Sequence, residues 1–338
     1  MHKNKKSLKN LFNIFSPKLE IKQQYSQSLF YNLDDPVWTK RDYSQFAEQA
    51  YIKNVIANRC INMIAQSAAN VPWCLYKKTK TGKIEIKDHP ILKLLDHPNP
   101  TSAGAEFFEN IYAYKLISGN AYILSINIDN KHPNELHLLR PDKVTIIPGD
   151  YNLAAAYKYT NGSDKTIYPV NVISGQSTIL HLRNFHPLDD WYGLSPIEAA
   201  SYSIDQHNQA AMWNQSLLQN GARPSGAIIV KTANDGSGGV LSEEQFIRLK
   251  EQIDEKFTGT INAGRPLLLE GGLEWKEMSL TPKDMDFIEA KNSAARDIAL
   301  AFGVPPQLLG IPGDNTYRNM REARLALWEE TILPLLDH

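Results

Sequence analysis

A seven-residue repeat of apolar side chains, found in two separate helical segments, constrains this fold more than any other feature. The first segment runs from Ser195-Pro196, a serine cap followed by a proline in the first turn, to Asn220. The second starts after Pro282 and runs to Phe302. Each repeat makes one narrow stripe, which favours a long helix packed edge to edge with copies of itself. We predict that the following stripe residues contact a neighbouring copy: Ile197, Ile204, Ala211, Leu218, Ile288 and Ala295.

The residues between these two helices indicate a small α/β insert. Ser242 and Gln245 form a capping box at the start of its helix. Two of its strands are joined through Gly271-Gly272, which is typical of a tight turn. The predicted strands are Gly226–Lys231, Pro266–Glu270 and Leu273–Ser279.

The region before the first long helix mixes helices with short alternating strands, which indicates an α+β domain with an antiparallel sheet. The apolar spacing predicts one helix from Tyr43 to Ala69. A second helix starts at Thr101 or Ser102 and ends at Gly119. The predicted strands, of which the first two form a hairpin, are Trp73–Lys77, Lys83–Lys87, Ala121–Asn127, Glu135–Leu139, Val144–Pro148, Ala156–Thr160 and Ile179–Arg183.

Composition limits the partners. The 338 residues carry 36 Lys and Arg against 37 Asp and Glu, a net charge of −1. A protein that coats nucleic acid needs a surplus of cations, so any contact with DNA is expected to be local or transient. The two cysteines, Cys60 and Cys74, are too few for a disulfide framework or a four-cysteine metal site. No apolar run approaches the roughly 18 residues of a membrane-spanning helix, so we predict no membrane partner.

Residues 1–42 form a basic N-terminal arm with two interpretations. Leu8, Leu11, Phe12 and Phe15 fall on one helical face beside several lysines, as in a helix that docks on a membrane surface or a partner. The interpretation that we favour is a mobile, solvated arm ahead of the first domain.

The sequence contains none of the catalytic signatures G-x-x-x-x-G-K-[ST], G-x-S-x-G or H-E-x-x-H. A metal-dependent hydrolase remains an alternative, because His181, His186, Asp189 and Asp190 supply two imidazoles and two carboxylates for a divalent ion. The other interpretation is a polar, hydrogen-bonded corner between the domain and the long helix. We predict the corner, and therefore no catalytic residue, no metal, no cofactor and no enzymatic activity.

A polar, aromatic and basic stretch follows the Gly/Pro-rich loop after Phe302 and allows two interpretations. It is either a loop that offers arginine and amide groups to a polyanion, or a helix N-terminus whose arginines pair with Glu322 or Glu329. Its residues are Asn315, Thr316, Tyr317, Arg318, Arg321 and Arg324.

Five stretches resemble the portal proteins of tailed bacteriophages, in the subfamily of long-tailed phages and their prophages. The resemblance covers roughly residues 45–338, and its later stretches are highly specific. These stretches are Asp96–Pro100 (DHPNP), Leu139–Val144 (LRPDKV), Asp190–Ile197 (DWYGLSPI), Asn220–Gly226 (NGARPSG) and Ala301–Gly310 (AFGVPPQLLG).

The resemblance implies a ring, typically of twelve copies, at one vertex of a capsid. Through its channel the terminase packages double-stranded DNA, and the tail attaches to its outer end. The implied partners are further copies of the chain, the terminase large subunit, a head–tail adaptor, the major capsid or scaffold protein, and double-stranded DNA. The implied location is the virion, reached from the host bacterial cytoplasm during assembly.

By position, the resemblance divides the chain into the parts of a portal subunit. These are the arm 1–42, the wing 43–192, the stem helices 193–221 and 282–303, the clip 222–281, the tunnel loop 304–318, and a kinked helix 319–338 that re-enters the wing. The channel residues would be Asn315, Thr316, Tyr317, Arg318 and Arg321. The clip would meet its partners through Phe246, Lys250, Glu251 and Arg265. Portal proteins usually continue into a crown, so we expect a lost crown, or a truncated prophage or gene-transfer-particle copy.

Overall fold

The structure is a computed structural model that describes residues 42–337, apart from several gaps. The gaps are residues 81, 128–131, 150–152, 172, 220–225, 231–242, 245–246, 249–272, 278–286 and 313–316. All described residues belong to one compact unit, Trp38–His338. Within the described part of the chain, no helix is both long and apolar enough to cross a membrane.

The helix predicted from Tyr43 to Ala69 is broken in two, which corrects the sequence analysis. The observed elements are α1 (Tyr43–Gln45), the π-helix η1 (Phe46–Ile52) and α2 (Val55–Ala69). Asn54 causes the break, because its backbone is extended and its side-chain Oδ1 accepts the amides of Ile56 and Ala57 at 3.1 and 3.0 Å. It is the N-cap of α2, and the polar side chain of a cap stops the preceding helix from continuing.

A hairpin and two helices follow. They are β1 (Leu75–Thr79), β2 (Gly82–Ile86), α3 (Pro90–Asp96) and α4 (Gly104–Ser118). The hairpin is antiparallel, as predicted. The predicted start of α4 at Thr101 or Ser102 is wrong, because the amide and hydroxyl of Thr101 are both bound by the Asn99 side chain in a turn. Gly119 ends α4 with a left-handed φ of 76°.

The six strands from β3 to β8 form two separate three-stranded antiparallel sheets. One has the order β4-β3-β8 and the other β5-β6-β7. Their bounds are β3 (Asn120–Ile126), β4 (Glu135–Leu139), β5 (Val144–Pro148), β6 (Ala154–Asn161), β7 (Asp164–Pro169) and β8 (Ile179–Arg183). Strand β7 is not predicted, because its residues are nearly all exposed and lack the buried alternation of a half-covered strand.

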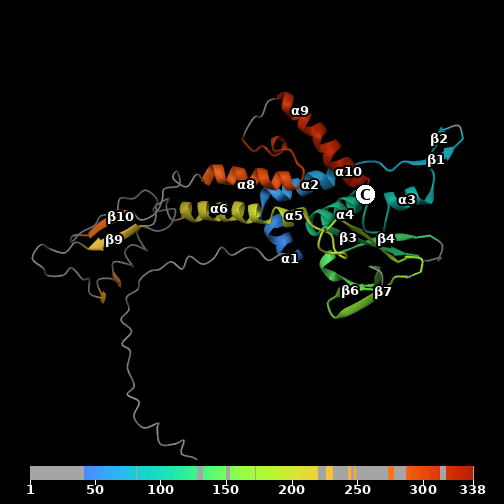
Figure 1. The fold of residues 1–338 in the computed structure, drawn as a ribbon, viewed down its shortest axis with the longest axis horizontal. Coiled ribbons are helices and arrows are strands. Elements are labelled where there is room, and N and C mark those ends of the chain that lie inside the picture. The colour runs from blue at the N-terminus through green and yellow to red at the C-terminus, as the bar shows by residue number, and fades with distance from the viewer. Residues whose placement is uncertain are drawn as a thin grey trace, which may run out of the picture. The chain divides into compact units, whose positions relative to one another are not determined.

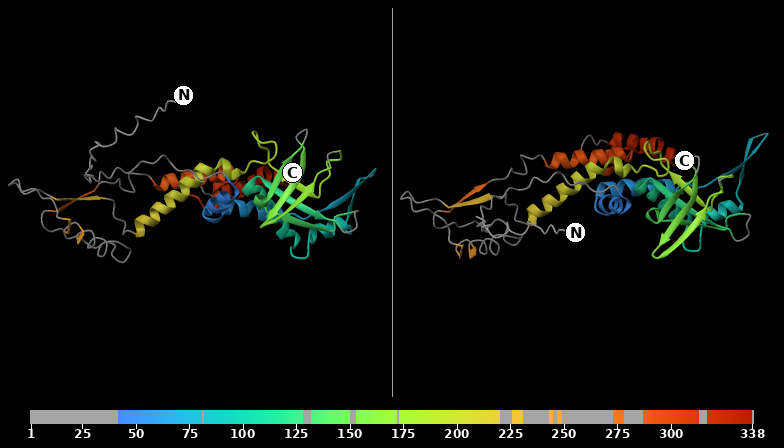
Figure 2. Two further views of the ribbon diagram at one scale, coloured as in Figure 1. Left: turned by 90° about the horizontal axis from the view of Figure 1, so that it is seen from below. Right: turned by 60° about the horizontal axis from the view of Figure 1, so that its bottom comes forward.

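The C-terminal half is built from two long antiparallel helices and a final helical segment. The first predicted long helix is divided at Ala200 into α5 (Pro196–Ala199) and α6 (Ser201–Gln219). Figures 1 and 2 show α6 and α8 side by side. The other elements are β9 (Gly226–Val230), its antiparallel partner β10 (Leu273–Glu277), α8 (Phe287–Ala301), the 3-10 helix η5 (Pro306–Leu309), α9 (Tyr317–Ala326), the π-helix η6 (Leu327–Ile332) and α10 (Leu333–Leu336).

The largest hydrophobic core lies where these helices meet α2 and α4. Its fully buried isoleucines include Ile61 of α2, Ile197 of α5, Ile298 of α8 and Ile332 of η6. The chain therefore folds back so that its C-terminal helices cover its N-terminal ones. The predicted arm 1–42 (except its last residue, Asp42) and the predicted strand Pro266–Glu270 lie outside the described residues.

Candidate functional site

Three of the six predicted stripe residues are buried within the chain, which corrects the prediction that these three contact a neighbouring copy. The exposed fractions of Ile197, Ile204 and Ala295 are 1%, 2% and 4%. Ile197 and Ile204 belong to the same core cluster as Phe302 and Ile298. These side chains have no area left to offer to another subunit. A heptad repeat does not distinguish a helix of the same chain from a helix of a copy.

Two other stripe residues remain accessible. Ile288 of α8 is 76% exposed, and Ala211 of α6 is also exposed. Both lie toward the end of the helix pair that is farther from the core cluster. The side chain of Leu218 lies outside the described residues.

The opposite face of α6 carries exposed aromatic side chains. Tyr202 and Trp213 are 52% and 44% exposed, and the exposed Gln206 and Gln209 lie between them at helical spacing. Positions 202, 206, 209 and 213 share one helix face, about half a turn away from Ile204. Large aromatic side chains on an otherwise polar face are typical of an interface with another chain.

Two pairs of polar residues mark the register of α6 against α8. Ser203 Oγ donates to Asp297 Oδ2 at 3.5 Å, and one turn further along His207 lies close enough to Lys291 for the cation to act on it. Because the helices are antiparallel, this register brings Met212 of α6 level with Ile288 of α8. Met212 is 59% exposed, so the pair presents apolar area at this level.

A buried polar contact fixes α6 to the N-terminal helices. The Asn54 Nδ2 group lies 3.2 Å from His207 Nδ1 and donates to Asn208 Oδ1 at 3.0 Å. Asn208 in turn donates to the Gln49 carbonyl at 2.9 Å. Burial lowers the pKa of His207, and the nearby Lys291 lowers it further, so the ring is a neutral acceptor for Asn54. This contact anchors α6 against rotation.

The junction between the sheets and the long helix is a close backbone contact between two glycines. A Cβ atom on Gly119 would lie 2.2 Å from the carbonyl oxygen of Gly193. The Gly119 carbonyl accepts the Asn184 amide at 2.9 Å, and Gly193 N donates to Asn120 Oδ1 at 2.7 Å. Ser195 then caps α5 and also donates to the Leu116 carbonyl at 2.9 Å. The end of α4 and the start of α5 are therefore locked together.

The DWYGLSPI stretch supplies most of this junction. Asp189, just before it, accepts the amides of Trp191 and Tyr192 at 2.7 and 3.0 Å. The Tyr192 hydroxyl accepts the Ile146 amide at 3.0 Å, which connects the stretch to β5. The geometry thus confirms the prediction of a polar, hydrogen-bonded corner. Asn120 and Gly119 are its unpredicted half, and the only sequence signal for them is the Gly-Asn pair that ends α4.

The four residues considered as metal ligands bind other groups of the chain, and Asp190 does so through its backbone carbonyl, which accepts from the Arg183 guanidinium. Asp189 is occupied by backbone amides, and His186 Nδ1 accepts the Leu188 amide at 3.0 Å. His181 Nε2 donates to Asn120 Oδ1 at 2.9 Å, because that oxygen also accepts the Gly193 amide. Among the described residues no three His, Cys, Asp or Glu side chains form a group that could hold a metal ion.

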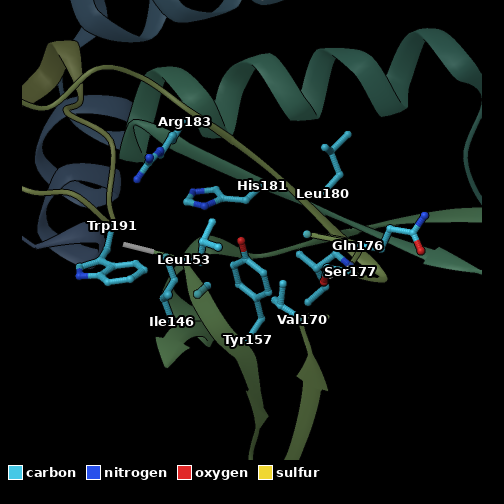
Figure 3. Close-up of a pocket in the computed structure, with 13 residues that line it drawn as sticks. Ile146, Leu153, Tyr157, Val170, Gln176, Ser177, Leu180, His181, Arg183 and Trp191 are labelled. Atoms are coloured by element: carbon cyan, nitrogen blue, oxygen red, sulfur yellow. Dashed lines mark hydrogen bonds between the residues drawn. The ribbon is translucent and has the colours of Figure 1, made fainter. Parts of the chain in front are cut away.

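His181 also lines a cavity of about 480 Å³ between the two sheets, shown in Figure 3. Its ring stacks on Tyr122 with a centroid distance of 4.4 Å and meets Tyr157 edge-on at 6.0 Å. Burial, with a further contribution from Arg183, lowers the pKa of His181 from 6.5 to about 4. A neutral imidazole between two phenol rings and an amide has a structural role here.

We expect the wild-type protein to lose stability at acidic pH through His181. As the pH is lowered from 6.5 to about 4, His181 is protonated in the unfolded chain but stays neutral in the folded chain. The free energy of unfolding therefore decreases as the pH decreases over this range. The full loss is about 3 kcal/mol, at 1.36 kcal/mol per pKa unit. Urea unfolding from pH 7.5 to 4.5 should show a steeper loss for wild type than for His181→Gln. Parallel curves for the two proteins would contradict a buried neutral His181.

The first part of the loop after α8 is bound both by α8 and by η6. Val304 N donates to the Ala299 carbonyl at 2.9 Å, and Thr331 Oγ1 donates to the Gly303 carbonyl at 2.6 Å. Ile311 is buried, and Arg296 of α8 donates to the Pro312 carbonyl. The path of the chain is therefore fixed by α8 and η6 as far as Pro312.

The predicted channel and clip residues fall mostly outside the described part of the chain. Asn315 and Thr316 are outside it, and Tyr317 and Arg318 are placed in α9 without described side chains. Arg321 is exposed on α9. The four predicted clip contacts, Phe246, Lys250, Glu251 and Arg265, all lie outside the described residues.

Comparison with known proteins gives a consistent result. A sequence model of the family described as "Phage portal protein" matches residues 56–338. An uncharacterized protein of Rickettsia bellii (strain RML369-C) is 56% identical over 308 residues, which are 91% of this chain and 78% of the relative. The portal protein of Enterobacteria phage HK97 is 26% identical over 288 residues, which are 82% of this chain and 63% of the phage protein. A chain in the structure "Neck of native GTA particle computed with C12 symmetry" is 43% identical with a TM-score of 0.63, covering 89% of this chain and 79% of that chain.

Proposed function

The chain belongs to the phage portal protein family, and we propose that twelve copies form a ring through which double-stranded DNA enters and leaves a particle. The family match over residues 56–338 carries this proposal. The antiparallel α6–α8 pair with an exposed aromatic face supports it, because such a face suits repeated packing around an axis. The twelvefold symmetry of the similar particle neck supports the copy number.

We assign the parts of the subunit by position. Residues 43–192 are the wing, 193–221 and 282–303 the stem, 222–281 the clip, 304–318 the tunnel loop and 319–338 the helix that returns to the wing. In this assignment the Gly119–Gly193 contact is the joint between wing and stem. The clip meets the terminase large subunit and the head–tail adaptor, and the wing meets the major capsid or scaffold protein. Assembly takes place in the host bacterial cytoplasm.

The tunnel loop and the first turns of α9 face the DNA. Asn315, Thr316, Tyr317, Arg318 and Arg321 are the channel residues in this proposal. Two observations support it: the exposure of Arg321, and the anchoring of the chain just before the loop tip by Arg296 and buried Ile311. The protein is a conduit in this account, and energy for transport comes from a separate motor.

Sequence identity distinguishes two kinds of particle in which such a ring occurs. The chain is 43% identical to a subunit in the gene-transfer-agent neck and 26% identical to the portal protein of phage HK97. A gene-transfer-agent type of particle is therefore our second candidate. The ring and its channel are common to both candidates.

In our proposal the ring interface is the outward face of α6, and Tyr202 and Trp213 are its main apolar contacts. The observation behind it is that the outward residues are exposed while Ile197 and Ile204 are buried in the chain. Aromatic side chains at the centre of an interface contribute a disproportionate share of its energy.

Replacing Tyr202 and Trp213 by Asp is expected to dissociate the ring and leave the subunit folded. Two carboxylates in a desolvated interface lose their hydration without gaining a partner. Native mass spectrometry should give a single-chain mass for the double variant, and its circular dichroism spectrum should match that of wild type.

The matched control is Ile167→Asp, which replaces a large apolar side chain by a carboxylate at a 59% exposed position on β7. This variant should keep the mass of wild type. An intact ring in the Tyr202→Asp, Trp213→Asp protein would show that subunits meet through another face.

A further inference from the structure

The β1–β2 hairpin is exposed on both of its faces. Only Leu75, Thr79 and Ile86 are partly covered, and every other described residue of the two strands is exposed. Within the described part of the chain the two strands pair only with each other, as Figure 1 shows. A lone two-stranded hairpin is marginally stable in water. A two-stranded hairpin that is this exposed is therefore a candidate binding surface.

The hairpin carries the densest positive charge of the described strands. Between Leu75 and Lys87 there are five lysines and one glutamate, in a chain whose net charge is −1. None of the five makes an ion pair with another described residue; the described ion pairs of lysines are those of Lys53 and Lys93. The five are Lys77, Lys78, Lys80, Lys83 and Lys87.

The register places like charges opposite each other. Lys78 pairs directly with Lys83, and Tyr76 pairs with Glu85 on the same face of the hairpin. Like charges at directly opposed positions destabilise a strand pair. The Lys78–Lys83 repulsion therefore destabilises the free hairpin, and a bound polyanion would neutralise it. Nothing on this face provides a buried apolar centre.

We propose that this hairpin binds the phosphate backbone of double-stranded DNA outside the channel, through Lys78, Lys83 and the lysine at its turn, Lys80. The proposal rests on the proposed function, which brings DNA to the particle. Successive residues of one strand face lie about 6.6 Å apart and opposed residues about 5 Å apart, so the three ammonium groups can reach several neighbouring phosphates. Such contacts read no sequence, which suits packaged DNA of any content.

The lysine composition favours DNA over an acidic protein surface. Lysine is depleted from the cores of protein–protein interfaces, where aromatic residues, Met and Arg are enriched. Flexible point charges instead suit phosphates held through the release of counterions. A ring multiplies the effect, because every subunit presents one hairpin to the same polymer.

The test compares the wild-type chain with the variant Lys78→Ala, Lys80→Ala, Lys83→Ala. The probe is a covalently closed circular plasmid, which cannot thread through a closed ring, and binding is measured by filter retention between 50 and 200 mM salt. We expect the variant to bind at least about tenfold more weakly at 100 mM salt. The slope of log affinity against log salt should fall by about 2 to 3, at about 0.9 per lost phosphate contact.

Two further variants control for fold and for general charge. Lys78→Arg, Lys80→Arg, Lys83→Arg should retain the affinity and slope of wild type. Lys158→Ala, Lys165→Ala removes two lysines from the β6–β7 hairpin and should also bind as wild type. The thermal midpoint of the triple alanine variant should be equal to or above that of wild type, because the Lys78–Lys83 repulsion is gone.

Equal affinity and slope for wild type and the triple alanine variant would overturn the proposal. Unchanged plasmid binding together with failed head assembly would also overturn it, and would assign the hairpin to an acidic capsid surface. The mass of each sample reports separately on the ring. A ring without hairpin-dependent binding therefore removes this inference alone, whereas a wild-type monomer speaks against the proposed function.

Discussion

Replacing Ile204 by Asp unfolds the subunit instead of merely separating the ring. Ile204 is 2% exposed and packs in the core with α2, α5 and α8. An unpaired carboxylate in that environment is expected to cost at least about 5 kcal/mol, which is comparable to the whole stability of a typical domain. Insoluble expression, or an unfolded circular dichroism spectrum in the soluble fraction, is the expected result.

The control for this prediction lies in the same seven-residue repeat. Ile288 is 76% exposed, and Ile288→Asp should change the free energy of unfolding of the subunit by less than about 0.5 kcal/mol. If Ile204→Asp cannot be purified, Ile204→Ala should be soluble and lose about 2 to 4 kcal/mol in urea unfolding. A stable, folded Ile204→Asp monomer would contradict the internal packing of the stripe and return it to the subunit interface.

The second large effect is expected from Gly119→Ala at the joint between the sheets and α5. The residue has a φ of 76°, which costs an alanine about 1–2 kcal/mol. Its new Cβ would also lie 2.2 Å from the Gly193 carbonyl oxygen, and both atoms belong to rigid backbone. The two chain segments must separate, which breaks the hydrogen bonds of Asn120 and Asn184 across the joint. We expect a total loss of at least about 4 kcal/mol in urea unfolding.

The variant Gly310→Ala is the control that separates the cost of backbone strain from the cost of steric overlap. Gly310 has nearly the same φ, 70°, but no atom lies within 4 Å of the position of its Cβ. Gly310→Ala should therefore lose only about 1–2 kcal/mol. Similar losses for the two alanine variants would show that the Gly119–Gly193 contact is not tight.

The sequence predicts local structure well where a residue pattern is compatible with only one kind of helix, strand or turn. The bounds of β4, β5 and β8 agree with their predicted ranges, and Gly119 ends α4 as expected. Polar side chains that bind the backbone cause the errors. Asn54 breaks a helix that apolar spacing alone would continue. Asn99 holds Thr101 in a turn, so α4 begins only at Gly104. Apolar spacing does not distinguish a π-helix from an α-helix, so η1 and η6 are not predicted.

The candidate site is harder to predict because its contacts join residues far apart in the chain. Periodicity identifies the stripe of α5, α6 and α8, but not whether the chain or a copy covers it. The exposed aromatics Tyr202 and Trp213 become informative only once the buried face of α6 is known. Similarly, Asn120 looks like an ordinary residue after a helix, yet it binds both His181 and Gly193. The motif carrying Gly193 is visible in the sequence, and its partner is not.

The mass of the purified wild-type chain in solution tests the central claim most directly. Native mass spectrometry at micromolar concentration should give a closed ring of twelve 38.1 kDa subunits, with a single sharp mass. That result would support the proposed closed ring, whose contact face the Tyr202→Asp, Trp213→Asp variant tests. A monomer, or a ladder of open-ended sizes without a closed ring, would contradict the account.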